Sequence, residues 1–508
     1  MDGWGLSPSW AGNAIMMNNP PNISSYWRIY PHKVLNSYAQ DSRSNTIITD
    51  SRYAHETISA GRNIPQDREY IDEEIENHNF YRNQTLKAAF DFAKKNDSNV
   101  HYIGLLSDSK IHSKIEHLLA LIEFANRNNF KRLFLDLIID GENSTQCLKL
   151  IDQIRTKIAE TGCGQFSSVT GRNYAMANER NLENIADTNL MLTEAKAPHA
   201  DSIEEAIKHS QEKCFKNADI KPTLIKNNDG IVTIKANDSV IFFNFRADKI
   251  GTLTRTFIDP NLKLPFWKPN IINNIQITTF TRYFKSLNTQ VAFERPPLSD
   301  ILPELLAKFQ KSDLRITETV KKSHVTTFFN GGREDKFSLE ERKILPSIKN
   351  NLNPEMSGTQ ITLESIKAIK SLKYDFILIN FPNADTIAHT GNIRATGQAI
   401  LAVDRYVGQI ADACMSVGGA VLITADHGIA EEMRQKSGHS FNPVPFIFIA
   451  KDKKRDLLQG ALAIPSSTLS KIIGAKENLT DITPTILEML NIPKPEAMTG
   501  HSLLGKLE

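Results

Sequence analysis

Cysteine is scarce in this chain, and the few cysteines are not paired. The 508 residues include four, Cys147, Cys163, Cys214 and Cys414, which lie far apart with no short common spacing. A disulfide framework needs paired cysteines, so this pattern favours free thiols in a reducing compartment.

Long hydrophobic runs are absent as well. No apolar stretch in the printed sequence reaches the roughly 18 residues that a membrane-spanning helix requires. The first residues also lack the charged and then apolar order of a secretory signal. We therefore expect a soluble, cytoplasmic protein without a membrane partner.

The chain has no excess of charge of either sign. Its 60 basic and 58 acidic side chains leave a formal charge of +2, so nothing indicates a nucleic-acid or membrane-surface partner. Internal repeats and Gly/Ser-rich linkers are missing too. What is present is 40% hydrophobic residues over 508 positions, enough for two or more packed domains.

The stretch 418–450 carries the strongest sign of a functional site. It consists of a buried apolar strand, Asp426 and His427 at the end of that strand, a polar loop with His439, and a second apolar strand. Open α/β sheets place their sites at the carboxyl ends of strands, where Asp426 and His427 lie. A helix cap next to a solvated imidazole is the alternative interpretation of the same pair.

A second strand end repeats the same residue types. Residues 374–380 read as a buried strand, and Asp385 and His389 follow it four residues apart. One Asp-x-x-x-His spacing falls on a helical turn by chance often enough. Two such sets and His439 together predict a metal site.

Two further residues near the start of the chain have open interpretations. Asp2 looks like another strand-end carboxylate whose own strand is missing, or else it belongs to a terminal turn that frays. Ser51 precedes a helical stretch, where it would serve either as a helix cap or as a nucleophile beside a metal.

From about residue 71 the pattern changes to a regular alternation of strands and helices. Residues 100–106 and 132–139 are predicted strands, and the apolar positions between them follow the 3.6-residue helical period. Two prolines within 293–298 predict a hinge, because proline continues neither a helix nor a central strand. The fold class is therefore α/β. Residues 70–292 form an inserted domain, and residues 1–65 and 299–508 together form the other.

Many segments resemble one family, the cofactor-independent (2,3-bisphosphoglycerate-independent) phosphoglycerate mutases of the alkaline phosphatase superfamily. The similarity is collinear over nearly the whole length. The segments that carry it are residues 2–5, 51–67, 107–113, 171–176, 242–246, 319–334, 354–356, 385–392, 425–428 and 439–447.

The resemblance implies both a fold and an activity. The fold is an alkaline-phosphatase-like sheet domain that binds metal, with an inserted α/β domain that binds substrate. The activity is that of a glycolytic and gluconeogenic isomerase. Such an enzyme interconverts 3-phosphoglycerate and 2-phosphoglycerate through a phosphoserine intermediate and uses two Mn²⁺ ions. Other divalent metals are compatible, the partner is a small phosphorylated substrate, and a monomer is expected.

The family's functional positions map onto residues of this chain. The resemblance makes Ser51 the phosphorylated nucleophile. It assigns one metal to Asp385, His389 and His439, and the other to Asp2, Ser51, Asp426 and His427. The positions implied to contact the substrate are His112, Arg172, Arg246 and Lys321, with Lys249 in place of a further arginine. The chemistry is sensible, because a divalent metal lowers the proton affinity of a coordinated oxygen, and arginine pairs with phosphate and carboxylate.

Several positions depart from the family pattern. Glu142 and Asn143 replace an Arg-Asp pair, Asn178 replaces an arginine, and the strand expected before Asp2 is absent. A phosphatase or phosphotransferase with another substrate therefore stays open as an alternative, and so does a non-catalytic relative. Retained metal-ligand positions argue against the last, because a protein without chemistry has no need of them.

Overall fold

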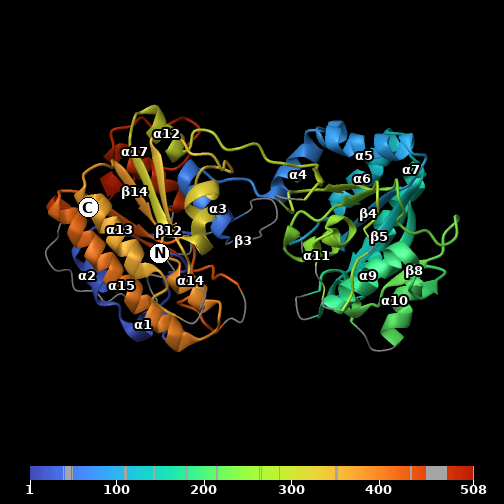
Figure 1. Cartoon of the computed structure of the whole chain (residues 1–508), viewed down its shortest axis with the longest axis horizontal. Helices are drawn as coiled ribbons and strands as arrows, with labels where there is room; N and C mark the ends of the chain where they lie inside the picture. Colours follow the sequence, from blue (N-terminus) through green and yellow to red (C-terminus); the bar gives the residue numbers. More distant parts are fainter. Residues whose placement is uncertain are drawn as a thin grey trace. The chain divides into compact units, whose positions relative to one another are not determined.

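The protein divides into two compact units (Figure 1), described in a computed structural model. Unit 1 consists of Met1–Ile64 and Pro296–Glu508, and unit 2 of Pro65–Arg295. The predicted segments were 1–65 with 299–508, and 70–292. The described residues are 1–37, 39–40, 47–48, 50–107, 111–140, 144–177, 181–212, 216–262, 264, 266–269, 271–284, 287–348, 353–434, 438–453 and 477–506. No helix among them is both long enough and apolar enough to cross a membrane.

Unit 1 contains two three-stranded sheets. In the first, β16 (Val444–Ile449) is the middle strand and pairs antiparallel with β1 (His32–Leu35) and β15 (Val421–Thr424). In the second, β12 (Asp313–Glu318) lies between β13 (Glu340–Leu345) and β14 (Phe376–Ile379), and all three are parallel. A separate pair is formed by β2 (Ala39–Gln40) and β3 (Ile47–Ile48).

Helices cover these sheets. The bounds are α1 (Ala14–Asn18), α2 (Pro21–Ile29), α3 (Ser51–Ala60), α12 (Leu302–Lys308), α13 (Gly358–Lys370), α14 (Asn383–Ala388), α15 (Ile393–Ser416) and α17 (Ile482–Met489). The helices α13 and α15 lie side by side (Figure 1). Asn392 caps α15 by accepting a hydrogen bond from the Ala395 amide, as the Asx side chain at a helix start is expected to do.

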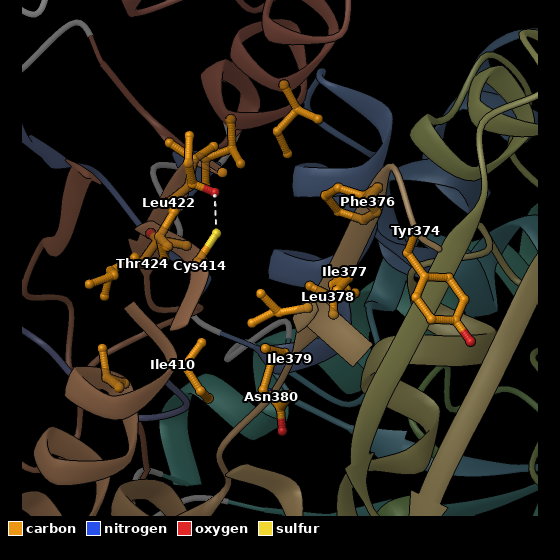
Figure 2. A pocket seen from close by; sticks show the side chains of 18 of the residues that line it. Tyr374, Phe376, Ile377, Leu378, Ile379, Asn380, Ile410, Cys414, Leu422 and Thr424 are labelled. Carbon is orange, nitrogen blue, oxygen red and sulfur yellow. Dashed lines mark hydrogen bonds between the residues drawn. The ribbon is translucent and has the colours of Figure 1, made fainter. Parts of the chain in front are cut away.

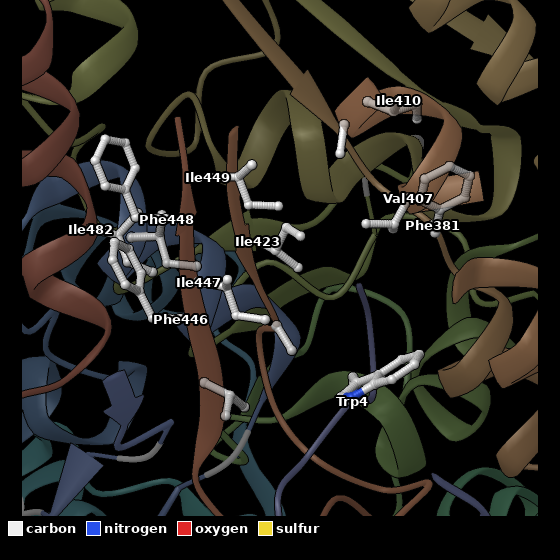
Figure 3. Close-up of a cluster of buried hydrophobic side chains, with 14 of the residues drawn as sticks. Trp4, Phe381, Val407, Ile410, Ile423, Phe446, Ile447, Phe448, Ile449 and Ile482 are labelled. Atoms are coloured by element: carbon white, nitrogen blue, oxygen red, sulfur yellow. The ribbon is translucent and has the colours of Figure 1, made fainter. Parts of the chain in front are cut away.

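The core of unit 1 is built around β16, whose six residues are all buried. Figure 3 shows Phe446 and Phe448 on one side of this strand, near Ile482 of α17, and Ile447 and Ile449 on the other, near Ile423. A strand that is apolar on both faces is typical of a sheet covered on both faces by helices. Trp4 is fully buried in the same cluster, so the first residues of the chain belong to the core.

Unit 2 contains one eight-stranded sheet in the order β11-β10-β9-β4-β5-β6-β8-β7. Its strands are β4 (Val100–Leu106), β5 (Leu133–Ile139), β6 (Gln165–Gly171), β7 (His199–Ala200), β8 (Thr223–Ile225), β9 (Ser239–Phe242), β10 (Gln276–Thr279) and β11 (Gln290–Val291). Every pair is parallel except β6 with β8. The predicted strands 100–106 and 132–139 are confirmed as β4 and β5.

The helices of unit 2 are α4 (Asp67–Glu76), α5 (Gln84–Lys95), α6 (Ile115–Arg127), α7 (Ser144–Thr161), α8 (Arg172–Ala175), α9 (Leu182–Glu194), α10 (Ile203–Glu212) and α11 (Ala247–Ile258). Of these, α4 and α5 precede the first strand of the sheet, and the other helices connect its strands. Two hydrophobic clusters, one around Phe124 and one around Phe257, pack against the sheet. The α/β fold class predicted from the alternation of strands and helices is confirmed.

A buried arginine links β12, the middle strand of the parallel sheet, to the segment that follows this strand. Arg315 of β12 has no exposed surface and pairs with Asp313, with its Nε 2.8 Å from Oδ1. Its Nη1 also donates to the carbonyl of Val325 at 2.8 Å. Val325 belongs to η5 (His324–Phe328), a short π-helix. The guanidinium therefore positions the segment that carries His324.

Replacing Arg315 with leucine should lower the free energy of unfolding of unit 1 by about 3–5 kcal/mol, because Asp313 is left buried without its partner. Denaturant unfolding followed by fluorescence measures this loss. The control is Lys343→Ala on the neighbouring strand β13, where an exposed ion pair with Glu364 contributes at most about 1 kcal/mol. The double variant Asp313→Leu/Arg315→Leu should regain part of the loss. A single-variant loss no larger than that of Lys343→Ala would contradict this role.

Candidate active site

The ends of two strands of unit 1 and the first residues of the chain converge on one buried cluster of carboxylates. Asp385 lies in α14, after β14, and Asp426 lies two residues after the end of β15. Asp2 is held between them, since its amide donates to the Phe381 carbonyl at 3.0 Å and its carbonyl accepts from the Asp385 amide at 3.2 Å. All three carboxylates are buried. Asp2 does lie in a turn, as the alternative interpretation had it, but this turn is buried and hydrogen-bonded, so the expected fraying is wrong.

The first group in the cluster is formed by Asp385, His389 and His439. His389 Nε2 lies 3.2 Å and His439 Nε2 3.8 Å from Asp385 Oδ1. Their potential ligand atoms all lie within 4.8 Å of one another. His389 follows Asp385 by one helical turn, as the spacing in the sequence predicted, whereas His439 comes from the distant loop before β16. One carboxylate and two imidazoles around one point are suited to a divalent transition metal.

The second group contains Ser51, Asp426 and His427. Ser51 Oγ lies 2.8 Å from His427 Nε2, and the same nitrogen is 3.1 Å from Asp426 Oδ2. The ring of His427 stacks on that of His439 with a centroid distance of 3.5 Å, which joins the two groups. The seven residues predicted as metal ligands are thus brought together, Asp2 included.

Helix α3 begins at Ser51, but Ser51 is not its cap. The Asp50 side chain accepts hydrogen bonds from the amides of Arg52 and Tyr53 at 2.9 and 3.3 Å. This leaves the Ser51 hydroxyl free to face His427, so the helix-cap interpretation of Ser51 is wrong. The helix-cap interpretation of Asp426 is wrong too, because its Oδ1 accepts from the amides of His427 and Gly3, and no helix begins there.

Two histidines in the cluster were not predicted. His55 Nε2 lies 3.7 Å from Asp426 Oδ2 and 3.9 Å from Asp2 Oδ1, and His324 packs edge-on against the His55 ring. His55, His324 and Asp426 form a second set of potential metal ligands within 4.8 Å of one another. A signal for His55 was present in the sequence, since it follows Ser51 by four residues and so shares its helix face. The only sequence signal for His324 was its position, three residues after Lys321.

Lys321 lies among the carboxylates of unit 1. Its Nζ is 2.7 Å from Asp385 Oδ2 and 3.1 Å from Asp2 Oδ2, and its side chain is buried. Burial acts to lower the pKa of Lys321, but the charges of Asp2, Asp385 and Asp426 outweigh it and raise that pKa well above its usual value. The ammonium therefore stays charged and offsets part of the negative charge in the cluster.

The same balance governs the pKa values of the acidic and imidazole groups. Burial acts to raise the pKa of Asp385, but the hydrogen bond from His389 and the Lys321 charge bring it to about 2. Burial acts to lower the pKa of His427, but the adjacent Asp426 carboxylate raises it to about 9. For His324 burial dominates and lowers the pKa to about 4. The Asp385 carboxylate is therefore ionised and His324 is neutral at pH 7, the forms that bind metal, whereas His427 is protonated and must release its proton when it binds a metal.

Several buried oxygen and nitrogen atoms of the cluster make no hydrogen bond of good geometry among the described residues, although the carboxylate oxygens lie within ion-pair distance of Lys321, His389 or His427. They are Asp2 Oδ2, Asp385 Oδ1, Asp426 Oδ2, His55 Nε2 and His324 Nδ1. A buried polar atom without a partner is costly, and such atoms normally bind something. Ionised carboxylate oxygens and imidazole nitrogens facing one another fit divalent cations. The donor set and the orphaned atoms therefore match a metal centre.

The other predicted substrate-binding residues lie in unit 2, whereas Lys321 lies in unit 1. Arg172, the first residue of α8, donates from Nη1 to Asp140 Oδ2 at 2.7 Å, and its Nη2 lies 3.2 Å from His112 Nε2. Arg246 precedes α11, and Lys249 lies in the first turn of that helix. The structure brings Arg172 and His112 together. The predicted departures at Glu142, Asn143 and Asn178 lie outside the described residues.

Known proteins resemble this chain over its whole length. The sequence profile of the Metalloenzyme superfamily matches residues 1–494. A 2,3-bisphosphoglycerate-independent phosphoglycerate mutase from Clostridioides difficile is 36% identical, with 100% of this chain and 98% of the relative covered. One from Clostridium novyi is 35% identical, with 99% and 98% covered. The crystal structure of a Leishmania mexicana phosphoglycerate mutase at low cobalt concentration aligns with a TM-score of 0.64 and 25% identity, covering 99% and 96% of the two chains.

These matches define the chain first as a member of the metalloenzyme superfamily, the class that the buried carboxylate and imidazole cluster indicates. Within that superfamily it belongs to the 2,3-bisphosphoglycerate-independent phosphoglycerate mutases, which are isomerases. The family predicted from the sequence motifs is thereby confirmed.

Proposed function

We propose that this chain interconverts 3-phosphoglycerate and 2-phosphoglycerate by passing the phosphoryl group through Ser51. The observation that carries the proposal is the position of the Ser51 hydroxyl, 2.8 Å from His427 Nε2 at the edge of the carboxylate cluster. A serine hydroxyl is a weak nucleophile at neutral pH and needs such an environment to be activated.

Two divalent ions, Mn²⁺ in our proposal, would be held by residues of unit 1. Asp385, His389 and His439 would hold one, and Asp2, Ser51, Asp426 and His427 the other. Mixed carboxylate and imidazole donors suit Mn²⁺ better than Ca²⁺. When bound, such ions lower the pKa of a coordinated hydroxyl and neutralise charge on a transferred phosphoryl group. His55 and His324 face the same carboxylates and would support the second ion or replace one of its ligands.

The side chains of unit 1 would carry the phosphoryl transfer. The Ser51 oxygen forms a bond to phosphorus while the bond from phosphorus to the glycerate oxygen breaks. Ser51 loses its hydroxyl proton, and the departing glycerate oxygen gains one. The second half-reaction reverses these steps with the neighbouring glycerate hydroxyl, so that atoms and charge balance over the cycle. The Lys321 ammonium would stabilise the negative charge of the phosphoryl oxygens.

The side chains of unit 2 would bind the glycerate. His112, Arg172, Arg246 and Lys249 provide cationic or hydrogen-bonding groups, and Arg172 is oriented by its contact with Asp140. A planar guanidinium suits a carboxylate or phosphate because it donates two parallel hydrogen bonds. Since one chain carries both the metal-type cluster and these groups, we propose that the enzyme works as a monomer, with its glycolytic reaction in the cytoplasm.

A direct assay tests the proposal and separates it from phosphatase activity. The purified protein is incubated with Mn²⁺ and 3-phosphoglycerate, and 2-phosphoglycerate is detected through enolase. We expect 2-phosphoglycerate to form without stoichiometric release of phosphate. Release of free phosphate without 2-phosphoglycerate would contradict the mutase and support a phosphatase. Neither product would favour a non-catalytic relative.

A further inference from the structure

A buried glutamate, Glu431, lies four residues after His427 in the segment that follows β15. Only 1% of its surface is exposed. Among the described residues no lysine, arginine or histidine forms an ion pair with it, so uncharged donors alone hold its carboxylate. Taking a carboxylate out of water without a cation is costly, and the hydrogen bonds to it must offset that cost.

Three donors from two distant segments meet this carboxylate. The Gly5 amide donates to Oε2 of Glu431 at 3.1 Å. The side-chain amide of Asn442 donates to Oε1 at 3.0 Å, and the Ser440 hydroxyl donates to the same oxygen. An ionised carboxylate only accepts hydrogen bonds and has two oxygens to do so, and it therefore satisfies all three donors at once.

Two of the donors lie beside residues of the metal cluster. Gly5 lies three residues after Asp2, and Ser440 directly follows His439. Glu431 shares its own segment, the one after β15, with two further members of the cluster. The carboxylate therefore joins three segments that carry potential metal ligands and are far apart in the sequence. These segments are residues 1–6, 425–431 and 438–443.

Backbone hydrogen bonds join the same three segments around Glu431. The Ala430 amide donates to the Gly3 carbonyl at 3.1 Å, and the Ser440 amide donates to the Gly428 carbonyl at 2.8 Å. The main chains thus approach one another closely at this place, and the Glu431 side chain is enclosed between them.

Two glycines make room for the carboxylate. A Cβ atom on Gly5 would overlap the carboxyl carbon of Glu431, and a Cβ atom on Gly428 would overlap its Oε1. Neither glycine has a left-handed φ, so the backbone conformation does not require glycine at either position. The close approach of the Glu431 carboxylate explains both of them.

Asp2 also borders an apolar groove. The groove has a volume of about 460 Å³ and lies between β14 and β15. Figure 2 shows Ile377 across an open space from Leu422. Aliphatic side chains such as these make no directed bonds, so the position of the segment that carries Asp2 depends on its hydrogen bonds, the one from Gly5 to Glu431 among them.

We propose that Glu431 is a positioning residue of the metal site, whose carboxylate holds the segment of Asp2 and the loop of His439 where both can bind their ions. This inference rests on the proposed function, because it concerns the site at which the two ions would bind. Glu431 would touch neither ion nor substrate and would act through Gly5 and Ser440. Replacing a group that orients metal ligands typically lowers metal affinity by about 10-fold to 100-fold.

The variant Glu431→Gln tests this role, because the amide keeps the size of the side chain and replaces one acceptor oxygen with a donor. In either orientation its NH₂ group faces a donor, which is the Gly5 amide in one case and the Asn442 amide in the other. We expect Mn²⁺ to bind about 10-fold to 100-fold more weakly than to the unmodified chain. The measurement is a Mn²⁺ titration of the metal-free full chain, with unbound ion read from its electron paramagnetic resonance signal.

Glu432→Gln is the matched control. It makes the same chemical change at the next residue, whose carboxylate also accepts a hydrogen bond from Asn442 Nδ2, at 3.0 Å. Its Mn²⁺ affinity should equal that of the unmodified chain. Circular dichroism at the titration temperature shows that each variant is folded. A role in stability alone would lower the Tm of Glu431→Gln and leave the Mn²⁺ affinity of the folded chain unchanged, and that result would overturn the proposal. An equal loss of affinity in Glu432→Gln would overturn it too.

Ser440→Ala is a milder second variant, which removes only one of the three donors to Glu431. It provides the answer if Glu431→Gln does not fold. We expect its Mn²⁺ affinity to be lower than that of the unmodified chain, and an unchanged affinity would overturn the proposal.

The unmodified chain separates this inference from the proposed function. If it bound no Mn²⁺, the proposed function and the role of Glu431 would both be refuted. If the unmodified chain and the folded variants bound Mn²⁺ equally well, only the role of Glu431 would be.

Discussion

Replacing Ser51 with alanine is expected to lower kcat for phosphoglycerate interconversion by about 10⁴-fold or more, because the group that accepts the phosphoryl is removed. Metal binding should persist. Asp2, Asp426 and His427 remain, and the buried carboxylates keep their charges. The measurement is the enolase-coupled rate in Mn²⁺, combined with a metal titration.

The control is Ser416→Ala, which makes the same chemical change at an exposed position at the end of α15. Its kcat should match that of the unmodified enzyme. A second readout is the phosphoenzyme, since brief incubation with substrate should phosphorylate the peptide that contains Ser51. Substantial turnover by the Ser51→Ala variant would mean that another group accepts the phosphoryl.

The second large effect is expected from the metal centre. Chelation should abolish turnover and added Mn²⁺ should restore it, because the orphaned carboxylate oxygens need cations to satisfy them. Asp385→Asn should lower kcat on the order of 10³-fold and reduce the metal bound per chain, because Asp385 is the only carboxylate in its group. Metal content is measured by elemental analysis after dialysis.

Asp375→Asn is the matched control for that substitution. Asp375 is exposed and lies just before β14, the strand whose carboxyl end leads to Asp385. There it accepts a hydrogen bond from the Ser312 amide. We expect its metal content and kcat to be unchanged. If Asp385→Asn bound as much metal as the control and turned over as fast, the first metal group would be assigned wrongly.

Local patterns in the sequence were enough to predict much of the fold and part of the site. The strands of unit 2 were readable because each is a short apolar run followed by a helix with a 3.6-residue period. Asp385 and His389 were readable because one helical turn separates them. The signal for His55 was equally local, because it follows Ser51 by four residues on one helix, but only the structure shows that this helix face points at Asp426.

Other parts of the site depend on segments that are hundreds of residues apart. Lys321 meets Asp2 and Asp385, and Ser51 meets His427, only because the strands of unit 1 end at one place. No spacing in the sequence encodes these contacts. Motifs shared with the mutase family supplied the residues, and the distances had to come from the fold.

The sequence by itself determined the α/β class and the strand ends at which ligand-type residues occur, because those features arise from periodicity and from residue type at short range, and its resemblance to known motifs indicated the family. The tertiary structure alone decided that His55 and His324 join the carboxylates, that the Lys321 ammonium offsets their charge, and that β14 and β15 border a groove. Burial and charge balance are properties of atoms brought together across the chain, and they exist only once the sheets have packed.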